Sequence, residues 1–242
     1  MQEDTLNPES RILNPNLSIP DYLEKTYWWA YVRPWAVRLF ERDWLINLIL
    51  WGWYEPLRDR VLAAMGDQIS GKTLKISCCY GALEPMLAQR VHAGQGRLDI
   101  IDVAPEQLKN ARRKIPEGLE GSVVNLYHRD ACDLGFADNS YDRALIFFLP
   151  HEQPEGIRRQ TFAEAFRVVR KGGEIYVAEF NRCAWWHPLK YIWHTALYVL
   201  EPYAPPLWKK ELSTWMPDEG RGCRIEKTSL FGGFYQIVKI TL

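Results

Sequence analysis

The 242-residue sequence predicts an α/β fold, in which a mostly parallel sheet carries helices on both faces and ends in an antiparallel hairpin. Three observations support this fold. Residues 73–102 read as a strand, a tight loop, a helix and a second strand that Asp102 closes. Apolar runs and helical patterns then alternate as far as residue 180. Gly232 and Gly233 separate two β-rich runs near the end of the chain, which is typical of a hairpin.

The region before the sheet divides into a tail and a helical cap, which together are expected to span residues 1–60. Residues 1–19 are polar with repeated Asn and Pro, so we expect an unstructured lead-in without a chemical role. Apolar residues at helical spacing predict helices over residues 22–31 and 35–51. Pro34 separates the two, because proline breaks or kinks a helix.

The second cap helix is apolar on more than one face. Its segment Trp44–Tyr54 is shorter than the roughly 18 apolar residues that a membrane-spanning helix needs. Two interpretations stay open: a cap packed against the sheet, or a surface that lies against a membrane. A further helix, Glu55–Met65, is expected to lead into the sheet domain of residues 61–242.

The loop of the first strand–helix unit departs from the usual phosphate-binding pattern. Such loops contain several glycines so that the backbone can approach the ligand, yet only Gly81 is present among Cys78, Cys79 and Tyr80. Asp102 follows roughly 20 residues after this glycine, where nucleotide-binding units place the acid that bonds a ribose hydroxyl. The sequence therefore predicts a nucleotide site with an altered loop.

The same alternation is expected to complete the sheet beyond the first unit. The helices are predicted at Pro105–Lys114 and Arg158–Arg170, and the strands at Val123–Tyr127, Tyr141–Leu149, Glu174–Phe180, Arg224–Leu230 and Phe234–Leu242. Gly172 and Gly173 are expected to end the second of these helices. Residues 182–222 interrupt the pattern with aromatic residues and prolines. This insertion predicts either a lid that binds substrate or an extra helical layer over the sheet edge.

The composition excludes some classes of function. Thirty basic residues balance thirty acidic ones, so no net charge attracts a nucleic-acid partner. The five cysteines lack paired zinc spacing and, without a secretory signal, indicate reduced thiols and a cytoplasmic setting. The 11 Trp and 12 Tyr crowd into residues 22–54 and 185–215, which predicts an apolar substrate. We expect peripheral contact with the inner face of the cell membrane, and the sequence leaves the oligomeric state open.

Four motifs in residues 62–242 resemble, in order and spacing, a class I S-adenosylmethionine-dependent methyltransferase. They are the first-strand loop LKISCCYGAL, the second-strand motif IIDVAPEQLKNAR, the stretch RDACDLGFADNSYDRAL and the fifth-strand motif VVRKGGEIYVAEF. The resemblance implies a Rossmann-like, seven-stranded fold and S-adenosylmethionine as cofactor. It places Asp102 at the ribose hydroxyls and Asp130 at the adenine amino edge. The full set of cofactor-binding residues that it implies is Cys78, Tyr80, Gly81, Asp102, Val103, Asp130 and Ala131.

The departures from that family concern the methionine half of the cofactor site. Where the family has an acidic-x-Gly-x-Gly-x-Gly pattern, Lys75 occupies the acidic position, and Ser77 and Cys79 replace the first two glycines. The usual acid receives the ammonium group of the cofactor, which a lysine would repel. Because side chains alternate along a strand, Lys75 either faces this site or points to solvent.

These departures, the aromatic N-terminal region and the aromatic insertion resemble the rhodoquinone-biosynthesis RquA-type family over nearly the whole chain. The resemblance implies conversion of ubiquinone to rhodoquinone, in which an amino group replaces a ring methoxy group, with S-adenosylmethionine as amino donor and manganese as a second cofactor. The altered loop agrees with this reaction, because an amine must be neutral to attack and a nearby cation lowers its pKa. The alternatives are an ordinary methyltransferase acting on a quinone or lipid-like phenol, and a protein of this fold without the cofactor.

Candidate chemistry lies at the carboxyl ends of the strands, where open parallel sheets bind their ligands. His151 and Glu152 follow the fourth strand, and Glu179 ends the fifth. Carboxylate and imidazole suit manganese, so the predicted metal ligands are His151, Glu152 and Glu179, with His187 and Asn181 in reserve. The candidate catalytic residues are His151, Glu152 and Tyr80, the first two as general acid or base. A surface or helix-capping role is the other interpretation of the histidine.

Five aromatic residues are candidate contacts for the quinone ring or its isoprenoid tail. They are Trp28, Trp29, Tyr31, Trp185 and Trp186. For any one of them core packing is the alternative role. As a set they favour an apolar substrate over a sugar or a peptide.

Overall fold

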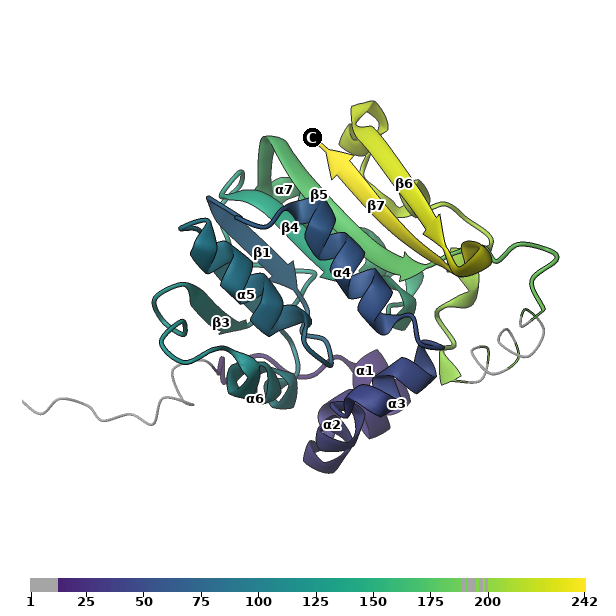
Figure 1. The fold of residues 1–242 in the computed structure, drawn as a ribbon, viewed down its shortest axis with the longest axis horizontal. Coiled ribbons are helices and arrows are strands. Elements are labelled where there is room, and N and C mark those ends of the chain that lie inside the picture. The colour runs from purple at the N-terminus through teal and green to yellow at the C-terminus, as the bar shows by residue number, and fades with distance from the viewer. Residues whose placement is uncertain (1–12, 189, 191–194, 196–197, 199) are drawn as a thin grey trace, which may run out of the picture.

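The computed structural model describes residues 13–188, 190, 195, 198 and 200–242. They form a seven-stranded sheet with strand order β3-β2-β1-β4-β5-β7-β6 (Figure 1). The strands are β1 (Lys72–Ile76), β2 (Arg97–Asp102), β3 (Val124–His128), β4 (Tyr141–Phe147), β5 (Val169–Phe180), β6 (Arg224–Leu230) and β7 (Tyr235–Thr241). The helices are α1 (Asp21–Tyr27), α2 (Pro34–Phe40), α3 (Asp43–Ile49), α4 (Tyr54–Met65), α5 (Leu83–Ala93), α6 (Pro105–Lys114) and α7 (Glu155–Val168).

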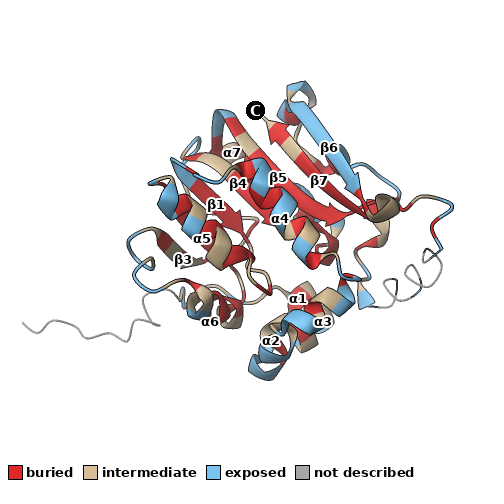
Figure 2. Ribbon diagram, viewed as in Figure 1, coloured by how far each residue is buried: buried red, intermediate tan, exposed pale blue. Residues whose placement is uncertain are grey.

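The sheet confirms the predicted fold class. Strands β1 to β5 pair in parallel, and β7 pairs antiparallel with both β5 and β6. Helices α4 and α5 lie on one face of the sheet and α7 on the other (Figure 1). With both faces covered, the inner strands are apolar on both sides, as the buried neighbours Leu145 and Ile146 in β4 show. Strand β6 is at the edge and is exposed except for Leu230 (Figure 2).

The predicted hairpin turn at Gly232 and Gly233 is confirmed, and it contacts the start of the insertion. Both glycines have positive φ, at 59° and 92°. A Cβ on Gly232 would lie 2.4 Å from the His187 ring, and one on Gly233 would lie 2.7 Å from the Arg182 carbonyl oxygen. Glycine is therefore required here by backbone conformation and by close packing.

The cap differs from its prediction. The helix expected over residues 35–51 is two helices, α2 and α3, because the chain is extended at Arg42 (φ −73°, ψ 121°). The break lets the Glu41 side chain accept a hydrogen bond from the Gly81 backbone N–H, at 3.1 Å. The helix expected over residues 22–31 ends at Tyr27 and continues as one wider turn, Trp28–Val32. Of the predicted tail, residues 1–12 lie outside the described residues.

Helix α7 also ends earlier than predicted. The prediction placed its end at Arg170, before Gly172 and Gly173, but the chain becomes extended at Val169 and both glycines lie within β5. A Cβ on Gly173 would lie 2.7 Å from the Asp142 carbonyl oxygen in β4. These glycines therefore serve strand pairing rather than helix termination.

Hydrogen bonds attach the cap to the sheet domain. The Tyr80 hydroxyl donates to the Ala30 carbonyl oxygen at 2.5 Å, and the Tyr235 hydroxyl donates to the Leu50 carbonyl oxygen at 3.1 Å. Within the described ranges, no helix is both long and apolar enough to cross a bilayer. The division at residue 60 stays a prediction, because α4 begins at Tyr54 and packs on β5.

Candidate active site

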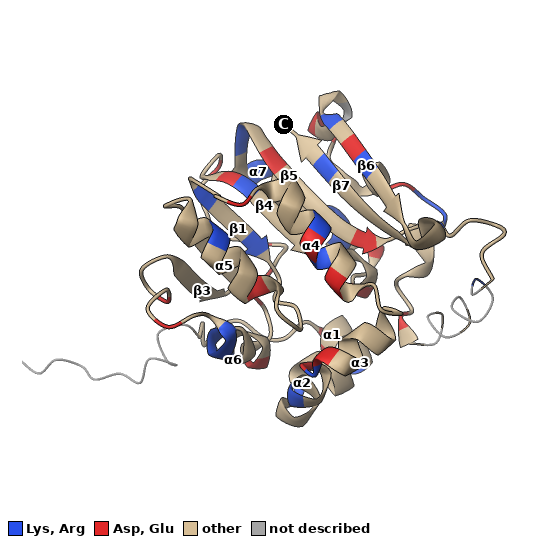
Figure 3. Cartoon of the chain, in the orientation of Figure 1, with Lys and Arg blue, Asp and Glu red and all other residues tan. Residues whose placement is uncertain are grey.

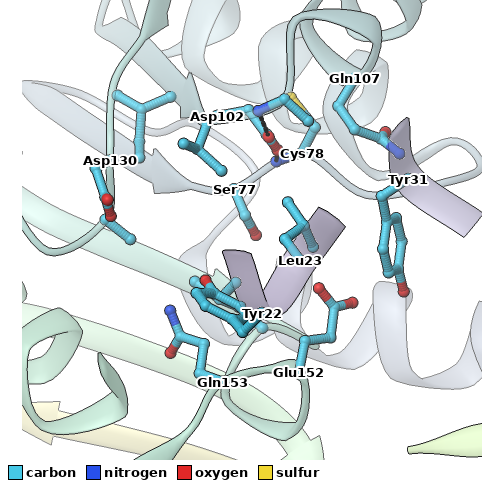
Figure 4. Close-up of a pocket in the computed structure, with 15 residues that line it drawn as sticks. Tyr22, Leu23, Tyr31, Ser77, Cys78, Asp102, Gln107, Asp130, Glu152 and Gln153 are labelled. Carbon is cyan, nitrogen blue, oxygen red and sulfur yellow. Dashed lines mark hydrogen bonds between the residues drawn. The ribbon is translucent and has the colours of Figure 1, made fainter. Parts of the chain in front are cut away.

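A cavity at the carboxyl ends of β1 and β2 gathers five of the seven predicted cofactor-binding residues, whereas Tyr80 and Gly81 do not line it. Its lining includes Cys78, Asp102, Val103, Asp130 and Ala131. Asp102 and Cys78 lie on one side, with Glu152 across the cavity from them (Figure 4). The cavity thus joins the end of β2, the loop after β1 and the turn after β4.

Asp102 is held by two backbone donors. The Cys78 N–H donates to its Oδ2 and the Ala104 N–H to its Oδ1, both at 2.7 Å (Figure 4). Burial raises the pKa of Asp102 to about 6, although these two hydrogen bonds oppose the shift. Both oxygens keep a further lone pair, which ribose hydroxyls can use.

The cap supplies part of this cavity, which the sequence did not indicate. Tyr22 and Leu23 of α1 and Tyr31 of the following turn line it together with Gln107 and Gln153. In Figure 4 Tyr22 lies beside Gln153 and Glu152. Spacing along the chain carries no signal for these contacts, because they arise only where the cap folds back over the strand ends.

The altered loop is built over buried charge. Lys75 is fully buried, so the alternative that it points to solvent is wrong. Its Nζ donates to the Ser77 carbonyl oxygen at 2.6 Å and lies 4.0 Å from Glu84 Oε1. Ser77 has φ of 68°, which non-glycine residues seldom adopt, and it lies where the family pattern has a glycine. Lys75 does not line the cavity at Asp102, nor the second, apolar cavity that is described below.

Glu84 on α5 is the buried carboxylate that pairs with Lys75. It is fully buried on α5 and accepts a hydrogen bond from the Cys79 N–H at 2.6 Å. Burial tends to raise its pKa, but Lys114 and Lys75 outweigh burial and lower it. Glu84 is therefore ionised, and its negative charge compensates the positive charge of Lys75.

Lys114, at the end of α6, joins the loop to the cap. Its Nζ donates to the carbonyl oxygens of Cys79 and Gly81 at 2.8 and 3.0 Å. It also lies 3.2 Å from Glu41 Oε2 and 3.3 Å from Glu84 Oε2. Burial tends to lower the pKa of Lys114, yet the neighbouring negative groups, led by Glu84, raise it. The ammonium group therefore stays charged and connects three segments.

A second, larger cavity lies beside the cofactor cavity and is mainly apolar. Its volume is about 440 Å³. The walls come from the turn Trp28–Val32, α2, α3, the β1 loop, the end of β4 and the insertion. Tyr31, Cys78 and Glu152 line both cavities. A ligand in the apolar cavity would therefore meet the cofactor site at these three side chains.

Polar groups in the apolar cavity cluster at His151. Its Nδ1 is 3.2 Å from Glu179 Oε2, and its Nε2 is 3.7 Å from Glu152 Oε1 and 4.0 Å from Glu201 Oε2. Burial tends to lower the pKa of His151, but the carboxylates, led by Glu179, raise it to about 9. Burial raises the pKa of Glu152 to about 8, with His151 opposing and Glu201 adding to the shift. Both pKa values are therefore raised above the ordinary values of these side chains, as is typical of groups at functional sites.

The predicted ligand Glu179 lies outside both cavities, whereas Glu201, which was not predicted, lines the apolar cavity. Glu179 Oε2 accepts from the His151 N–H at 3.1 Å and Oε1 from the Phe180 N–H at 2.6 Å, and this carboxylate lines neither cavity. Glu201 lines the apolar cavity, and its buried Oε2 has no hydrogen-bond partner. The sequence missed Glu201 because the insertion has no periodic pattern. Among the described residues, no three His, Cys, Asp or Glu side chains are arranged to hold a metal ion.

The remaining candidate residues divide between the cavities and the surface. Trp29 and Tyr31 line the apolar cavity, whereas Trp28, Trp185 and Trp186 are exposed and line neither cavity. The Tyr80 ring lines the apolar cavity and stacks on Tyr31 with centroids 5.8 Å apart. The Tyr80 hydroxyl donates a hydrogen bond to the Ala30 carbonyl oxygen and accepts one from Gln107 Nε2. The reserve ligands Asn181 and His187 are buried and line neither cavity.

Residues 73–173 match the family model described as a methyltransferase domain. They form a class I S-adenosylmethionine-dependent methyltransferase domain. Asp102 and Asp130, which line the first cavity, lie within the matched residues. Outside the matched residues lie the cap, most of β5, the insertion and the hairpin.

Three relatives show how the methyltransferase domain varies. The chain is 34% identical over 143 residues to phosphatidylethanolamine N-methyltransferase of Cereibacter sphaeroides, covering 59% of this chain and 66% of that protein. It is 24% identical to demethylmenaquinone methyltransferase of Bacillus velezensis, with coverages of 74% and 76%. It is 29% identical to the ubiquinone/menaquinone biosynthesis C-methyltransferase of Roseobacter denitrificans, with coverages of 54% and 49%. The last match spans about half of that relative's length.

The fold is shared with solved structures. An S-adenosylmethionine-dependent methyltransferase of Aquifex aeolicus aligns with a TM-score of 0.54 and 18% identity, covering 86% of this chain and 97% of that one. At this identity the likeness establishes the fold alone.

Replacing Lys114 by Met should lower the free energy of unfolding by about 3 kcal/mol, because buried Glu84 loses its nearest cation. Urea unfolding measures the loss. Lys109→Met is the matched control, since Lys109 on the same helix pairs only with Glu106 at the surface, and it should cost less than about 0.5 kcal/mol. A loss below about 1 kcal/mol for Lys114→Met would show that Lys75 alone balances Glu84.

The affinity for S-adenosylmethionine should fall as the pH drops through about 6, because a protonated Asp102 loses an acceptor for a ribose hydroxyl. Calorimetric titration across this range measures the affinity, and Asp102→Asn should remove its pH dependence. The stability of the free protein changes with pH in the opposite direction. The folded-state pKa lies above the ordinary 3.8, so this carboxyl's contribution to stability falls as pH rises from 3.8 to about 6. An affinity constant across the range would contradict the ribose assignment.

Proposed function

We propose that this protein uses S-adenosylmethionine to modify the ring of ubiquinone or a related isoprenoid quinone. The apolar cavity beside the cofactor site carries this proposal. Its volume of about 440 Å³ is in the range of small-molecule sites, and Tyr31, Cys78 and Glu152 connect it to the cofactor cavity. The apolar walls suit an isoprenoid tail, and the polar end at His151 and Glu152 suits a quinone ring.

Two reactions at the ring are candidates. The relatives favour methyl transfer, because all three are methyltransferases and two are named for quinone substrates. The loop favours the exchange of a ring methoxy group for an amino group. At the strand position of the family's acid, Lys75 is buried, so no carboxylate there holds the cofactor's amino group as an ammonium ion. We therefore propose the exchange, which makes rhodoquinone, with methyl transfer as the alternative.

The His151–Glu152 cluster can serve either reaction. When bound, S-adenosylmethionine supplies the nitrogen or the methyl group. Where no metal ion is bound, His151 Nε2–H donates a hydrogen bond to a ring carbonyl oxygen, and Glu179 at Nδ1 fixes the imidazole orientation. Glu152 in its ionised form accepts a proton from the attacking group, and the ionised share grows as the pH rises toward its pKa of about 8. In the exchange, the new C–N bond would replace the ring C–O bond, and this proton would pass to the methoxy group, which leaves as methanol. Release of the aminoquinone would also require elimination across the cofactor's N–Cα bond, with a proton from the adjacent carbon passing to the nitrogen.

Manganese remains part of the proposal through the resemblance to the rhodoquinone family. The candidate donors are His151 Nε2, Glu152 and Glu201, which line one cavity, although among the described residues they are not arranged to hold an ion. Glu179 would support His151 from behind rather than bind the ion, since both its oxygens are already bonded. A divalent ion held there would polarise a ring carbonyl.

Incubation with a short-tailed ubiquinone, S-adenosylmethionine and Mn²⁺ tests the reaction, with mass spectrometry of the quinone as readout. We expect the amino-for-methoxy product. A demethylated quinone offered in parallel tests the alternative, for which the product gains one methyl group. Recovery of both quinones unchanged, from a protein that binds the cofactor by calorimetry, would contradict the proposed substrate.

Glu152→Gln should lower turnover at least about 100-fold, because an amide cannot accept the proton. The fold should persist, since a carboxyl with a pKa of about 8 is mostly neutral at pH 7. His151→Ala should also abolish turnover and weaken Mn²⁺ retention, which metal analysis after gel filtration measures. Glu155→Gln, an exposed carboxylate on α7, is the control.

Two further variants separate the metal ligands. If Glu201 binds the ion, Glu201→Gln should lower Mn²⁺ affinity more than Glu179→Gln. The reverse order would restore the ligand set predicted from sequence. Unchanged metal content in both Glu152→Gln and His151→Ala would remove the metal assignment.

A further inference from the structure

The cap presents apolar side chains to solvent on the outer side of the substrate cavity. Trp35 on α2 is 57% exposed, and on α3 Trp44 and Leu48 are 60% and 66% exposed. Trp44 and Leu48 are four residues apart, so they share one face of α3. Soluble surfaces carry isolated apolar residues, but a contiguous group of this kind marks an interaction site.

Both sides of these helices are apolar. Leu45, Ile46 and Leu50 line the inner cavity, while Trp44 and Leu48 face outward. Leu39 and Ile49 do both, since they line the cavity and are 38% exposed. Leu200 of the insertion also lines the cavity and is 51% exposed. The cavity wall is therefore continuous with the outer apolar surface, and these residues mark its edge.

Charge around this surface selects its partner. Arg33, Arg38 and Arg42 are exposed beside the apolar residues. Of the two nearby acids, Glu41 turns inward to Lys114 and Asp43 alone is exposed. Figure 3 shows α3 itself almost without charged residues. Exposed tryptophans with adjacent arginines are the composition of a helix that lies in the interface of an anionic bilayer.

We propose that the outer surface of α2 and α3, formed by Trp35, Leu39, Trp44, Leu48 and Ile49, inserts into the headgroup layer of an anionic phospholipid membrane. Arg33, Arg38 and Arg42 bind the phosphates at its margin. The apolar cavity then opens toward the acyl chains at Leu39, Ile49 and Leu200, so that a lipophilic substrate enters without crossing water. The membrane surface stands by itself, while this route of entry rests on the proposed quinone substrate.

Co-sedimentation with vesicles tests the surface without any quinone. The full chain should bind vesicles of phosphatidylcholine with phosphatidylglycerol more tightly than phosphatidylcholine alone, and salt should weaken the binding. Trp44→Ser with Leu48→Ser should reduce binding about tenfold or more, because two apolar side chains no longer leave water. Replacing Arg33, Arg38 and Arg42 by Gln should remove the preference for anionic vesicles.

Controls separate this surface from folding and from the catalytic site. Ile225→Ser removes an exposed apolar side chain from the edge strand β6, away from α2 and α3, and should leave vesicle binding unchanged. The Trp44→Ser, Leu48→Ser protein should keep its thermal unfolding temperature and its S-adenosylmethionine affinity. It should turn over a short-tailed quinone normally but lose turnover of a long-tailed quinone in vesicles.

Two results would overturn the proposal. The first is the absence of binding to either type of vesicle by the unmodified chain. The second is a stable dimer, seen by light scattering, that Trp44→Ser with Leu48→Ser converts to a monomer, since the same face would then bind a second copy. Vesicle binding that survives when the quinone assay fails would leave the surface standing and reject only the substrate.

Discussion

The buried charges under the first loop support the rest of the site. Glu84 lies between two lysines, with its carboxylate 4.0 Å from Lys75 Nζ and 3.3 Å from Lys114 Nζ. Lys114 also pairs with Glu41, which belongs to the cap. Each charge would be costly if buried alone, but each is paired and hydrogen-bonded. The loop carbonyls and N–H groups of Cys79 and Gly81 are bonded into this cluster, so the loop, α5, α6 and the cap take one arrangement together.

This arrangement explains how a nucleotide-binding loop persists without its glycines. In the usual loop, glycine gives the backbone its freedom and a strand carboxylate takes the cofactor's ammonium group. Here Ser77 adopts positive φ with its carbonyl oxygen held by Lys75, and the buried acid Glu84 on α5 pairs with Lys75 and Lys114 without lining either cavity. The adenosine half of the site, at Asp102 and Asp130, keeps the ordinary family pattern. The departures from the family pattern are therefore confined to β1 and the loop that follows it.

The cap contributes to three features at once. Tyr22 and Leu23 help to close the cofactor cavity, Tyr31 lies between the two cavities, and α2 and α3 form the wall of the apolar cavity. Because Glu41 and Ala30 accept hydrogen bonds from the loop, the cap cannot shift without disturbing the cofactor site. The cap thus contributes residues to both cavities and also carries the exposed apolar surface.

The sequence by itself determined the fold class, the hairpin and the position of Asp102 and Asp130 at one edge of the sheet, because periodicity, glycine position and short motifs are local signals. Helix α6 was predicted with its observed bounds, and Asp102, Asp130 and Glu152 meet at one cavity. Only the tertiary structure decided that Lys75 is buried, that residues 35–51 form two helices, and that Glu201 rather than Glu179 lines the apolar cavity. Each depends on contacts between segments distant in sequence, since burial and charge pairing are set by which chain segments meet, and no local pattern records that.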